Sequence, residues 1–319
     1  MSESTNYQAS CEVPALAKVA GVEECSAVIN GVRWRYLHAG SGPALLLVHG
    51  FMAYSFSWRF VISGLARHFS VYAVDLPGCG FSERSEALTG TLASDSEGLL
   101  NFMDHMGVVQ FDVLGTSRGG GAAIALAGLM AERGALHRIR RLVLSAPINP
   151  WSKYWLLRIR LLRTRPGRIY VVHLARRLPF IQASIFKKLY GDPASIPPDS
   201  LKGYNAGFEP AGSYEHVWNI MRSWMAGLER IAAVLPSVES VPALLLWGER
   251  DTAVDPASAQ ELHRRWKNSV VRVMQRIGHM PYEEVPEEFN RIVTDFLLRD
   301  SLAAQLPTED PVTVEPGRA

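Results

Sequence analysis

The chain has 319 residues, of which 48% are hydrophobic and 20% are charged, and its formal net charge at neutral pH is +2. A chain of this length can bury the core of one large domain, and one domain with an insertion fits it better than two independent domains. The near-balance of charge gives no general case for a nucleic-acid partner, and three cysteines at unrelated spacings argue against a disulfide framework and a zinc site.

The two ends of the chain lack a periodic pattern. Residues 1–24 are mixed in character and residues 301–319 contain several prolines and acidic residues, so both segments are expected to be flexible. The first twenty residues include Glu3 and Glu12 and have no basic region followed by an apolar core, which argues against a secretory signal. No run of about 18 apolar residues could span a bilayer. The expected location is cytoplasmic.

Short apolar runs predict a sheet. The first two runs, 27–29 and 32–36, flank Asn30-Gly31, a dipeptide that tolerates the positive φ angles of a tight hairpin, so the chain should begin with an antiparallel pair. The later runs have the length and the continuous apolar character of strands that are buried on both faces. They are Ala44–Val48, Val71–Val74, Phe111–Leu114, Leu142–Leu144, Ala243–Trp247 and Val270–Met274.

Helical patterns separate most of these runs. In the last of them, apolar side chains recur from Phe289 to Leu297 at spacings of three and four residues, and Pro286 suits the first turn. Strands that alternate with helices are typical of the α/β class, in which helices cover both faces of a mostly parallel sheet. The expected core helices are Ser57–Phe69, Leu92–Met106, Gly119–Glu132, Ala257–Trp266 and Glu287–Leu298.

One connection is far longer than the others. About 95 residues separate Pro147 from Pro242, whereas connections in this class usually have about 2 to 6 residues plus one helix. The excess predicts an inserted helical cap over residues 148–241, on a core formed by residues 25–147 and 242–300. The expected cap helices are Trp151–Leu162, Arg168–Leu178, Ile181–Leu189 and Tyr214–Val234.

The pentapeptide from Gly115 to Gly119 has the pattern G-x-S-x-G and follows the apolar run that ends at Leu114. A serine at such a strand-to-helix turn is typical of a nucleophile elbow. The flanking glycines fit this interpretation, because a strained backbone at Ser117 leaves little room for nearby Cβ atoms. The pentapeptide alone occurs often by chance, but the strand before it and the helix after it favour a catalytic serine.

A serine nucleophile needs a base within hydrogen-bond reach and an acid that orients the base. Asp251 follows the run that ends at Trp247, and His279 follows the run that ends at Met274. Because α/β sheets place such groups at the carboxyl ends of different strands, these two residues can converge on Ser117, in the chain order serine, acid, histidine. His279 would take the proton from Oγ and return it to the leaving group, while Asp251 holds the imidazole tautomer.

The tripeptide that begins at His49 follows the strand Ala44–Val48 and is placed to form an oxyanion site. A backbone N–H near Phe51 and the N–H of Arg118 are the expected donors to the developing negative oxygen. Because the Arg118 cation lies at the positive end of a helix, an acidic neighbour is expected, with Glu283 or Glu284 as candidates.

Other titratable residues near these motifs have simpler interpretations. Asp255 competes with Asp251 for the role of the acid, and Asp251 is the preferred candidate. Asp75 ends a predicted strand, yet the Leu-Pro-Gly after it favours a turn-forming role. His49 is expected to shape the oxyanion loop rather than to transfer protons, and the remaining histidines form no cluster that resembles a metal site.

Together these motifs resemble the α/β-hydrolases of the serine-triad, capped type, which include esterases, carbon–carbon bond hydrolases and cofactor-free haloperoxidases. The likeness covers roughly residues 25–300. The motifs that carry it are His49-Gly50, the segment 75–82 (DLPGCGFS), the elbow around Ser117, the loop that holds Asp251, and Gly278-His279.

The resemblance implies eight strands with the second antiparallel, a cap after the sixth strand, and no metal or organic cofactor. Two features depart from the usual pattern: Cys79 stands where relatives often have another residue, and Gly119–Gly121 make the helix start looser than usual. Dehalogenases and epoxide hydrolases of this fold carry an aspartate at the elbow, so Ser117 argues against both.

The cap segment 151–190 combines basic and apolar residues, with ten Lys or Arg and no Asp or Glu. One interpretation is a face that attracts anionic substrates or makes weak contact with a membrane surface, as basic amphipathic helices do. The alternative, which we favour at this point, is that the apolar side lines the substrate pocket and the cations form a solvated outer face.

The sequence therefore predicts a cofactor-independent serine hydrolase that cleaves a small apolar or aromatic carboxylic ester through an acyl-enzyme. A carbon–carbon hydrolase of a vinylogous diketone and a haloperoxidase-like perhydrolase would use the same triad, and a binding protein on a hydrolase scaffold is a further alternative. The sequence leaves the oligomeric state open. Candidates to line the pocket, each of which could belong to the cap core instead, are Trp151, Trp155, Trp218, Met221, Trp224 and Met225.

Overall fold

The computed structural model describes residues 21–85 and 88–299. The predicted tail 301–319 and most of the predicted N-terminal segment 1–24 lie outside these residues. The first strand, β1 (Val22–Ile29), begins before the expected core boundary at Cys25. The sheet therefore includes the last residues of the segment that the sequence assigned to the terminus.

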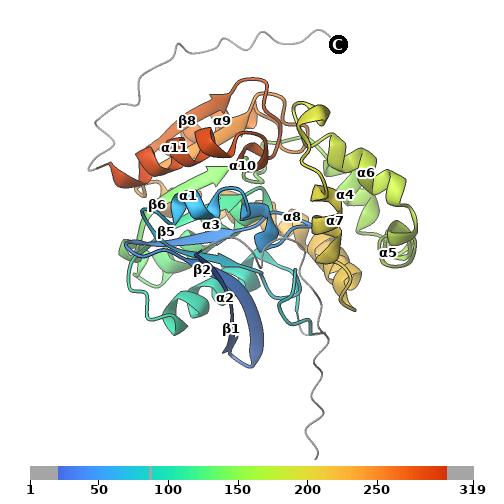
Figure 1. The fold of residues 1–319 in the computed structure, drawn as a ribbon, viewed down its shortest axis with the longest axis horizontal. Helices are drawn as coiled ribbons and strands as arrows, with labels where there is room; N and C mark the ends of the chain where they lie inside the picture. The colour runs from blue at the N-terminus through green and yellow to red at the C-terminus, as the bar shows by residue number, and fades with distance from the viewer. Residues whose placement is uncertain (1–20, 86–87, 300–319) are drawn as a thin grey trace, which may run out of the picture.

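A mixed sheet of eight strands forms the centre of the molecule (Figure 1). Its strands are β1, β2 (Val32–Ala39), β3 (Ala44–Val48), β4 (Ser70–Val74), β5 (Phe111–Thr116), β6 (Ile139–Ser145), β7 (Ala243–Gly248) and β8 (Ser269–Met274). Every predicted run falls within one of them. The order across the sheet is β1-β2-β4-β3-β5-β6-β7-β8. β2 is antiparallel to both β1 and β4, and the remaining neighbours are parallel, as the resemblance implied.

Helices cover both faces of the sheet. The core helices are α1 (Ile62–Leu65), α2 (Leu92–His105), α3 (Arg118–Glu132), α9 (Ser258–Arg265), α10 (Pro281–Glu284) and α11 (Pro286–Leu298). Side chains alternate between the two faces along a strand. Accordingly, Leu46 of β3 packs in the apolar cluster that contains α2 and α3, whereas its neighbour Leu47 packs in the cluster that contains α1 and α11.

The connection from β6 to β7 forms the inserted cap (Figure 1). Its elements are α4 (Leu156–Leu162), α5 (Arg165–Ile169), the π-helical turn η4 (Tyr170–Leu174), the 3₁₀ turn η5 (Ala175–Arg177), α6 (Pro179–Lys187), the 3₁₀ turn η6 (Pro193–Ser195), α7 (Ser200–Ala206) and α8 (Ser213–Val238). Figure 1 shows α4, α5, α6 and α7 gathered to one side of the sheet. The end of α8 returns to the core, where Val234 packs on Gly128 of α3.

Three predicted helices differ clearly from those observed, and one of them, expected at 168–178, is divided into α5, η4 and η5. Residues 57–69 form a 3₁₀ turn, η2 (Ser55–Trp58), and the short α1 instead of one helix. The first cap helix begins at Leu156 rather than Trp151, because the Asn149 side chain accepts the backbone N–H groups of Trp151 and Ser152 and holds them in a turn. No helix was predicted for the residues of α7.

In the part of the chain that the structure describes, no helix combines the length and the apolar character needed to cross a membrane.

Candidate active site

Ser117 occupies the turn between β5 and α3. Its backbone angles, φ 51° and ψ −119°, lie outside the regions that ordinary residues adopt, so the turn is strained. The backbone on both sides holds it in place: the Ser117 N–H donates to the Ser145 carbonyl at 2.9 Å, and the Ser117 carbonyl accepts the N–H of Ile148 at 3.0 Å. The predicted elbow is therefore present in its local geometry.

The glycines on each side of Ser117 allow this turn to form. A Cβ at Gly115 would lie 2.5 Å from the Gly119 carbonyl oxygen, and a Cβ at Gly119 would lie 2.2 Å from the carbonyl oxygen of Val48. Both contacts are with backbone atoms that cannot rotate away. The two positions therefore require glycine because β5, α3 and β3 approach each other closely.

Asp251 and His279 come together from loops that follow adjacent strands. The Nδ1 atom of His279 lies 2.7 Å from Oδ2 of Asp251, and the Asp251 side chain is fully buried. The other carboxylate oxygen accepts the backbone N–H groups of Ala253 at 2.7 Å and Val254 at 2.9 Å. A carboxylate held in this way fixes the imidazole with its proton on Nδ1, which leaves Nε2 as the nitrogen that can accept a proton.

Asp255, the competing acid, has a different place. Its side chain accepts the backbone N–H of Ala257 at 3.0 Å, and its own N–H donates to Ser152 Oγ at 3.0 Å. These contacts describe a residue that shapes the start of α9. Of the two candidates, Asp251 is the carboxylate that contacts His279.

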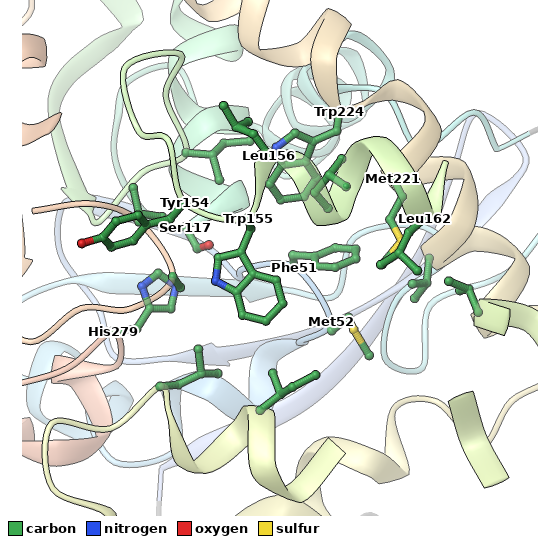
Figure 2. Close-up of a pocket in the computed structure, with 18 of the residues that line it drawn as sticks. Phe51, Met52, Ser117, Tyr154, Trp155, Leu156, Leu162, Met221, Trp224 and His279 are labelled. Carbon is green, nitrogen blue, oxygen red and sulfur yellow. The ribbon is translucent and has the colours of Figure 1, made fainter. Parts of the chain in front are cut away.

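Ser117 and His279 line one cavity of about 270 Å³ beneath the cap. Figure 2 shows both side chains at one end of this cavity, with Leu162 and Met221 toward the other end. Most of the lining is aliphatic or aromatic, and no Lys, Arg, Asp or Glu of the described residues belongs to it. The cavity can therefore hold an apolar group next to a serine and a histidine.

The expected oxyanion donors lie at the same end of the sheet. Phe51 lines the cavity, and Arg118 is the first residue of α3, where backbone N–H groups have no partner within the helix. The His49 ring supports this loop: Nδ1 contacts the Gly50 carbonyl at 2.9 Å, and Nε2 accepts the N–H of Leu76 at 3.1 Å. Burial lowers the pKa of His49, so the ring is neutral and its role is structural.

The predicted acidic neighbour of Arg118 was wrong. The guanidinium lies 2.6 Å from Asp95 of α2 and donates to the Gly90 carbonyl at 2.8 Å. Glu283 pairs instead with Arg59 at 2.6 Å. The prediction failed because Asp95 reaches Arg118 only through the packing of α2 on α3, a contact that the spacing of residues along the chain does not reveal.

Glu284, the other candidate, holds the histidine loop. Its carboxylate accepts the N–H of Gly278 at 2.8 Å and the N–H of Gly191 at 2.9 Å. Gly278 directly precedes His279. Glu284 therefore ties the backbone beside His279 to the end of the cap segment.

Asp75 has the structural role that the sequence favoured. Its fully buried carboxylate accepts the N–H groups of Ser55 at 2.8 Å and Phe81 at 2.9 Å, and it pairs with Arg35 at 3.3 Å. These contacts join the turn after β4 to β2 and η2.

Three of the six predicted pocket residues line the cavity: Trp155, Met221 and Trp224. With about 100° per residue in a helix, Met221 and Trp224 share one face of α8, and Trp218 and Met225 lie about a quarter turn away from it. Trp218 packs within the cap, Met225 packs against the core cluster, and Trp151 lies against that cluster beneath Arg265. These three residues were predicted to line the cavity and do not line it.

The sequence analysis missed most of the remaining lining. α4 presents Leu156, Ile159 and Leu162 to the cavity, a spacing of three residues that marks one helix face. That signal was available, but the helix had been placed five residues too early. Tyr154 and Ile185 also line the cavity, and both are more than a third exposed, so the cavity reaches the surface beside them.

Comparison with known proteins agrees with the fold. The model of the alpha/beta hydrolase fold family matches residues 43–286. The uncharacterized hydrolase YugF of Bacillus subtilis is 26% identical over 279 residues, which cover 84% of this chain and 96% of the relative.

Two solved structures show the same architecture. A putative alpha/beta hydrolase from Nostoc sp. PCC 7120 superposes with a TM-score of 0.75 at 22% identity, covering 87% of this chain and 98% of that chain. A bacterial membrane phospholipase A superposes with a TM-score of 0.65 at 26% identity, covering 87% of this chain and 86% of that chain. With a family model that spans most of its length and an eight-stranded sheet to match, the chain belongs to the α/β-hydrolase fold family.

Proposed function

We propose that this protein is a serine hydrolase that cleaves a carboxylic ester with an apolar or aromatic group. The observation that carries the proposal is the Asp251–His279 hydrogen bond at the edge of the cavity that Ser117 also lines. A hydroxyl, an imidazole and a carboxylate in this arrangement are the parts that an acyl transfer needs.

In the acylation step, Ser117 Oγ attacks the ester carbonyl carbon while His279 Nε2 takes the hydroxyl proton. The N–H groups of Phe51 and Arg118 stabilise the negative charge that develops on the carbonyl oxygen. When the tetrahedral intermediate collapses, the C–O bond to the alcohol breaks and His279 returns the proton to the departing oxygen. The acyl group is then an ester of Ser117.

In the deacylation step, water attacks the acyl carbon and gives its proton to His279. Collapse of the second intermediate releases the carboxylic acid and returns the proton to Ser117 Oγ. Asp251 stabilises the imidazolium in both steps and stays ionised throughout.

The cavity lining favours an ester over the carbon–carbon substrate. A pocket built to hold the acidic group of such a substrate would need inward-pointing cap arginines, and no Arg or Lys whose side chain the structure describes lines this cavity. Several described cap arginines point to solvent instead: Arg160, Arg163 and Arg165 are all exposed. The similarity to a membrane phospholipase A, an ester hydrolase by name, supports the same choice.

A panel of p-nitrophenyl esters of increasing acyl length tests the proposal, with Ser117→Ala as the blank. We expect turnover by the wild-type enzyme that rises with acyl length until the cavity is filled, and a loss of several orders of magnitude in kcat for the variant. A flat panel in which the variant equals the wild type would reject an esterase and would direct attention to perhydrolysis, which needs hydrogen peroxide and a carboxylic acid.

An active-site phosphonate separates an enzyme from a binding protein. Native protein should become covalently labelled at Ser117, and the Ser117→Ala variant should not. If the native protein stays unlabelled under conditions in which a known esterase reacts, the proposal of a serine hydrolase fails.

A further inference from the structure

The outer face of the cap carries large apolar side chains that contact water. Leu157 is 70% exposed, Phe180 is 67% exposed and Leu161 is 61% exposed. Ile169 and Leu174 in the same segment are also exposed. Apolar side chains that occur singly on a surface need no explanation, but several on one small insertion mark an interaction surface.

The geometry of α4 separates these residues from the cavity. At about 100° per residue, Leu156, Ile159 and Leu162 form the face that lines the cavity, and Leu157 and Leu161 lie on the opposite face. α4 is therefore apolar on two sides, and filling the substrate pocket accounts for only one of them. The interpretation favoured from the sequence placed solvated cations on the outer face, and the exposed Leu157 and Leu161 lie on that face of α4 as well.

Cations surround the outer apolar residues. Arg158 and Arg160 flank Leu157 and Leu161 around the helix, and exposed arginines or lysines recur in α5, η5 and α6. The segment 151–190 holds ten of the 33 Lys and Arg residues of the chain and none of its 31 Asp and Glu residues. Long basic side chains beside exposed leucines are typical of helices that lie at a lipid–water interface.

A second copy of the chain fits this face poorly as the occupant. Two such faces would bring many cations together without one carboxylate from either segment to balance them, and like charges at an interface cost affinity. An anionic lipid surface offers partners for both kinds of side chain on this face. Its phosphates carry negative charge that attracts the cations, and its acyl layer can bury the leucines.

The mouth of the cavity opens within the same segment. Tyr154 and Ile185 line the cavity and are exposed, and Leu156 lines it directly beside the outward-facing Leu157. Figure 2 shows Tyr154 near Ser117 and His279. A lipid surface in contact with α4 would therefore lie close to the entrance of the substrate pocket.

We propose that the face of α4 formed by Leu157, Leu161 and the flanking Arg158 and Arg160, here called the docking face, binds an anionic lipid bilayer. Binding buries the outward leucines at the headgroup boundary, and the cations contact the lipid phosphates. Docking holds the cap segment that contains the exposed lining residues Tyr154 and Ile185 close to the lipid. That a lipid ester is the substrate rests on the proposed function, whereas the docking itself does not.

Vesicle sedimentation tests the docking face in the full-length chain carrying Ser117→Ala, so that no lipid is cleaved. The vesicles are phosphatidylcholine alone or phosphatidylcholine mixed with phosphatidylglycerol. We expect the protein to pellet with the mixed vesicles and far less with the neutral ones. Adding Leu157→Ser and Leu161→Ser should weaken binding about tenfold or more, because these side chains lose their apolar contact with the lipid.

The matched control changes Val28→Ser and Val109→Ser, two exposed apolar residues of the core that lie outside the cap. It should bind like the parent. Arg158→Glu with Arg160→Glu, the two exposed cations that flank the leucines, should weaken binding to the mixed vesicles, and Arg67→Glu, an exposed core cation, is the control. Circular dichroism checks that each variant is folded.

Three results would overturn the docking face. The first is no binding to either kind of vesicle, and the second is an equal loss of binding in the leucine variant and its valine control. The third is binding to heparin that is as tight as binding to the mixed vesicles and is unchanged by the leucine substitutions. The last result would indicate a general polyanion site. Phosphonate labelling of the native protein reports on the triad separately, so a labelled protein that fails to bind vesicles rejects the docking face alone.

Discussion

At the scale of single residues, one buried carboxylate has two structural tasks. Asp251 Oδ1 accepts two backbone N–H groups from its own loop, and Oδ2 contacts Nδ1 of His279. The first task fixes the carboxylate, and the second fixes the imidazole. An amide in place of the carboxylate would keep the loop contacts and lose the correct partner for the ring.

We therefore expect Asp251→Asn to fold normally and to lower kcat by roughly 10⁴-fold, because the amide NH₂ would face Nδ1 and favour the tautomer that cannot accept the serine proton. Steady-state turnover of a p-nitrophenyl ester measures the effect. Asp255→Asn is the matched control: Asp255 holds only the start of α9, so kcat should stay close to that of the wild type. Equal losses in the two variants would remove Asp251 from the proposed triad.

These residues could be predicted from the sequence because the catalytic residues of a parallel sheet lie at the carboxyl ends of its strands, along one edge. Ser117, Asp251 and His279 each follow a strand, and strand ends can be recognised from apolar runs. The acidic partner of Arg118 could not be recognised in the same way, since Asp95 lies inside α2 and approaches only when α2 packs on α3. Which side chains of two helices meet depends on how each helix is rotated about its own axis. The spacing of residues along the chain does not determine that rotation.

At the scale of elements, close packing constrains the start of α3. The three glycines that the sequence analysis described as a loose start serve close packing: a Cβ at Gly120 would lie 2.7 Å from Pro147, and one at Gly121 would lie 2.7 Å from Ile148. The helix therefore begins in contact with β3 and with the loop after β6. This contact places the Arg118 N–H beside the oxyanion loop.

Gly119→Ala should prevent this approach. Its Cβ would meet the backbone oxygens of Val48 at 2.2 Å and His49 at 2.3 Å, and neither can move without shifting β3. We expect a loss of about 3 kcal/mol or more in the free energy of unfolding, at the upper end for overpacked cores, together with loss of esterase activity. Urea denaturation measures the first quantity.

Gly227→Ala is the comparison for this variant. It lies in α8, where the added Cβ would meet only the flexible side chain of Leu92 at 3.2 Å. The helical preference of alanine offsets much of that contact, so its stability should stay near that of the wild type. If both variants unfold at the same urea concentration, the close approach of α3 to β3 is not what requires Gly119.

The cap was harder to predict than the sheet for a physical reason. Strands in the core are continuous apolar runs, whereas the cap consists of short helices whose limits depend on side-chain contacts with the backbone. Asn149 delays α4, and the helix expected at 168–178 is divided into α5, η4 and η5. α8 extends to Val238 because its last turns pack on α3.

At the scale of the whole molecule, buried polar contacts join the cap to the core. Glu283 beside the histidine loop pairs with Arg59 of the core and accepts hydrogen bonds from Tyr190 and Tyr204 of the cap. Burial, with the Glu283 charge next in importance, raises the pKa of both tyrosine hydroxyls, so they remain donors at physiological pH. The cap is therefore held at the same loop that positions His279.

A second contact between cap and core should make folding depend on pH. His216 of α8 is buried against the turn after β4, where a Cβ at Gly78 would lie 2.6 Å from the imidazole ring. Burial lowers its pKa from 6.5 to about 4, the cations of Arg118 and Arg84 act in the same direction, and the Asp95 carboxylate opposes them. The folded protein keeps this ring neutral where the unfolded chain would protonate it.

The sign of the pH effect follows from this difference. Between pH values of about 6.5 and about 4 the unfolded chain binds a proton that the folded chain does not, so stability falls as the pH falls. At pH 5 the loss from His216 alone should be about 2 kcal/mol relative to pH 7.5. Urea unfolding at a series of pH values measures this slope, and His216→Gln, which cannot titrate, should flatten it.

His105→Gln, an exposed histidine at the end of α2, is the matched control and should leave the slope unchanged. Part of the slope should remain in His216→Gln, because burial also lowers the pKa of His49. Parallel pH curves for the wild type and His216→Gln would contradict the prediction, because the folded and unfolded chains would then bind the His216 proton equally well.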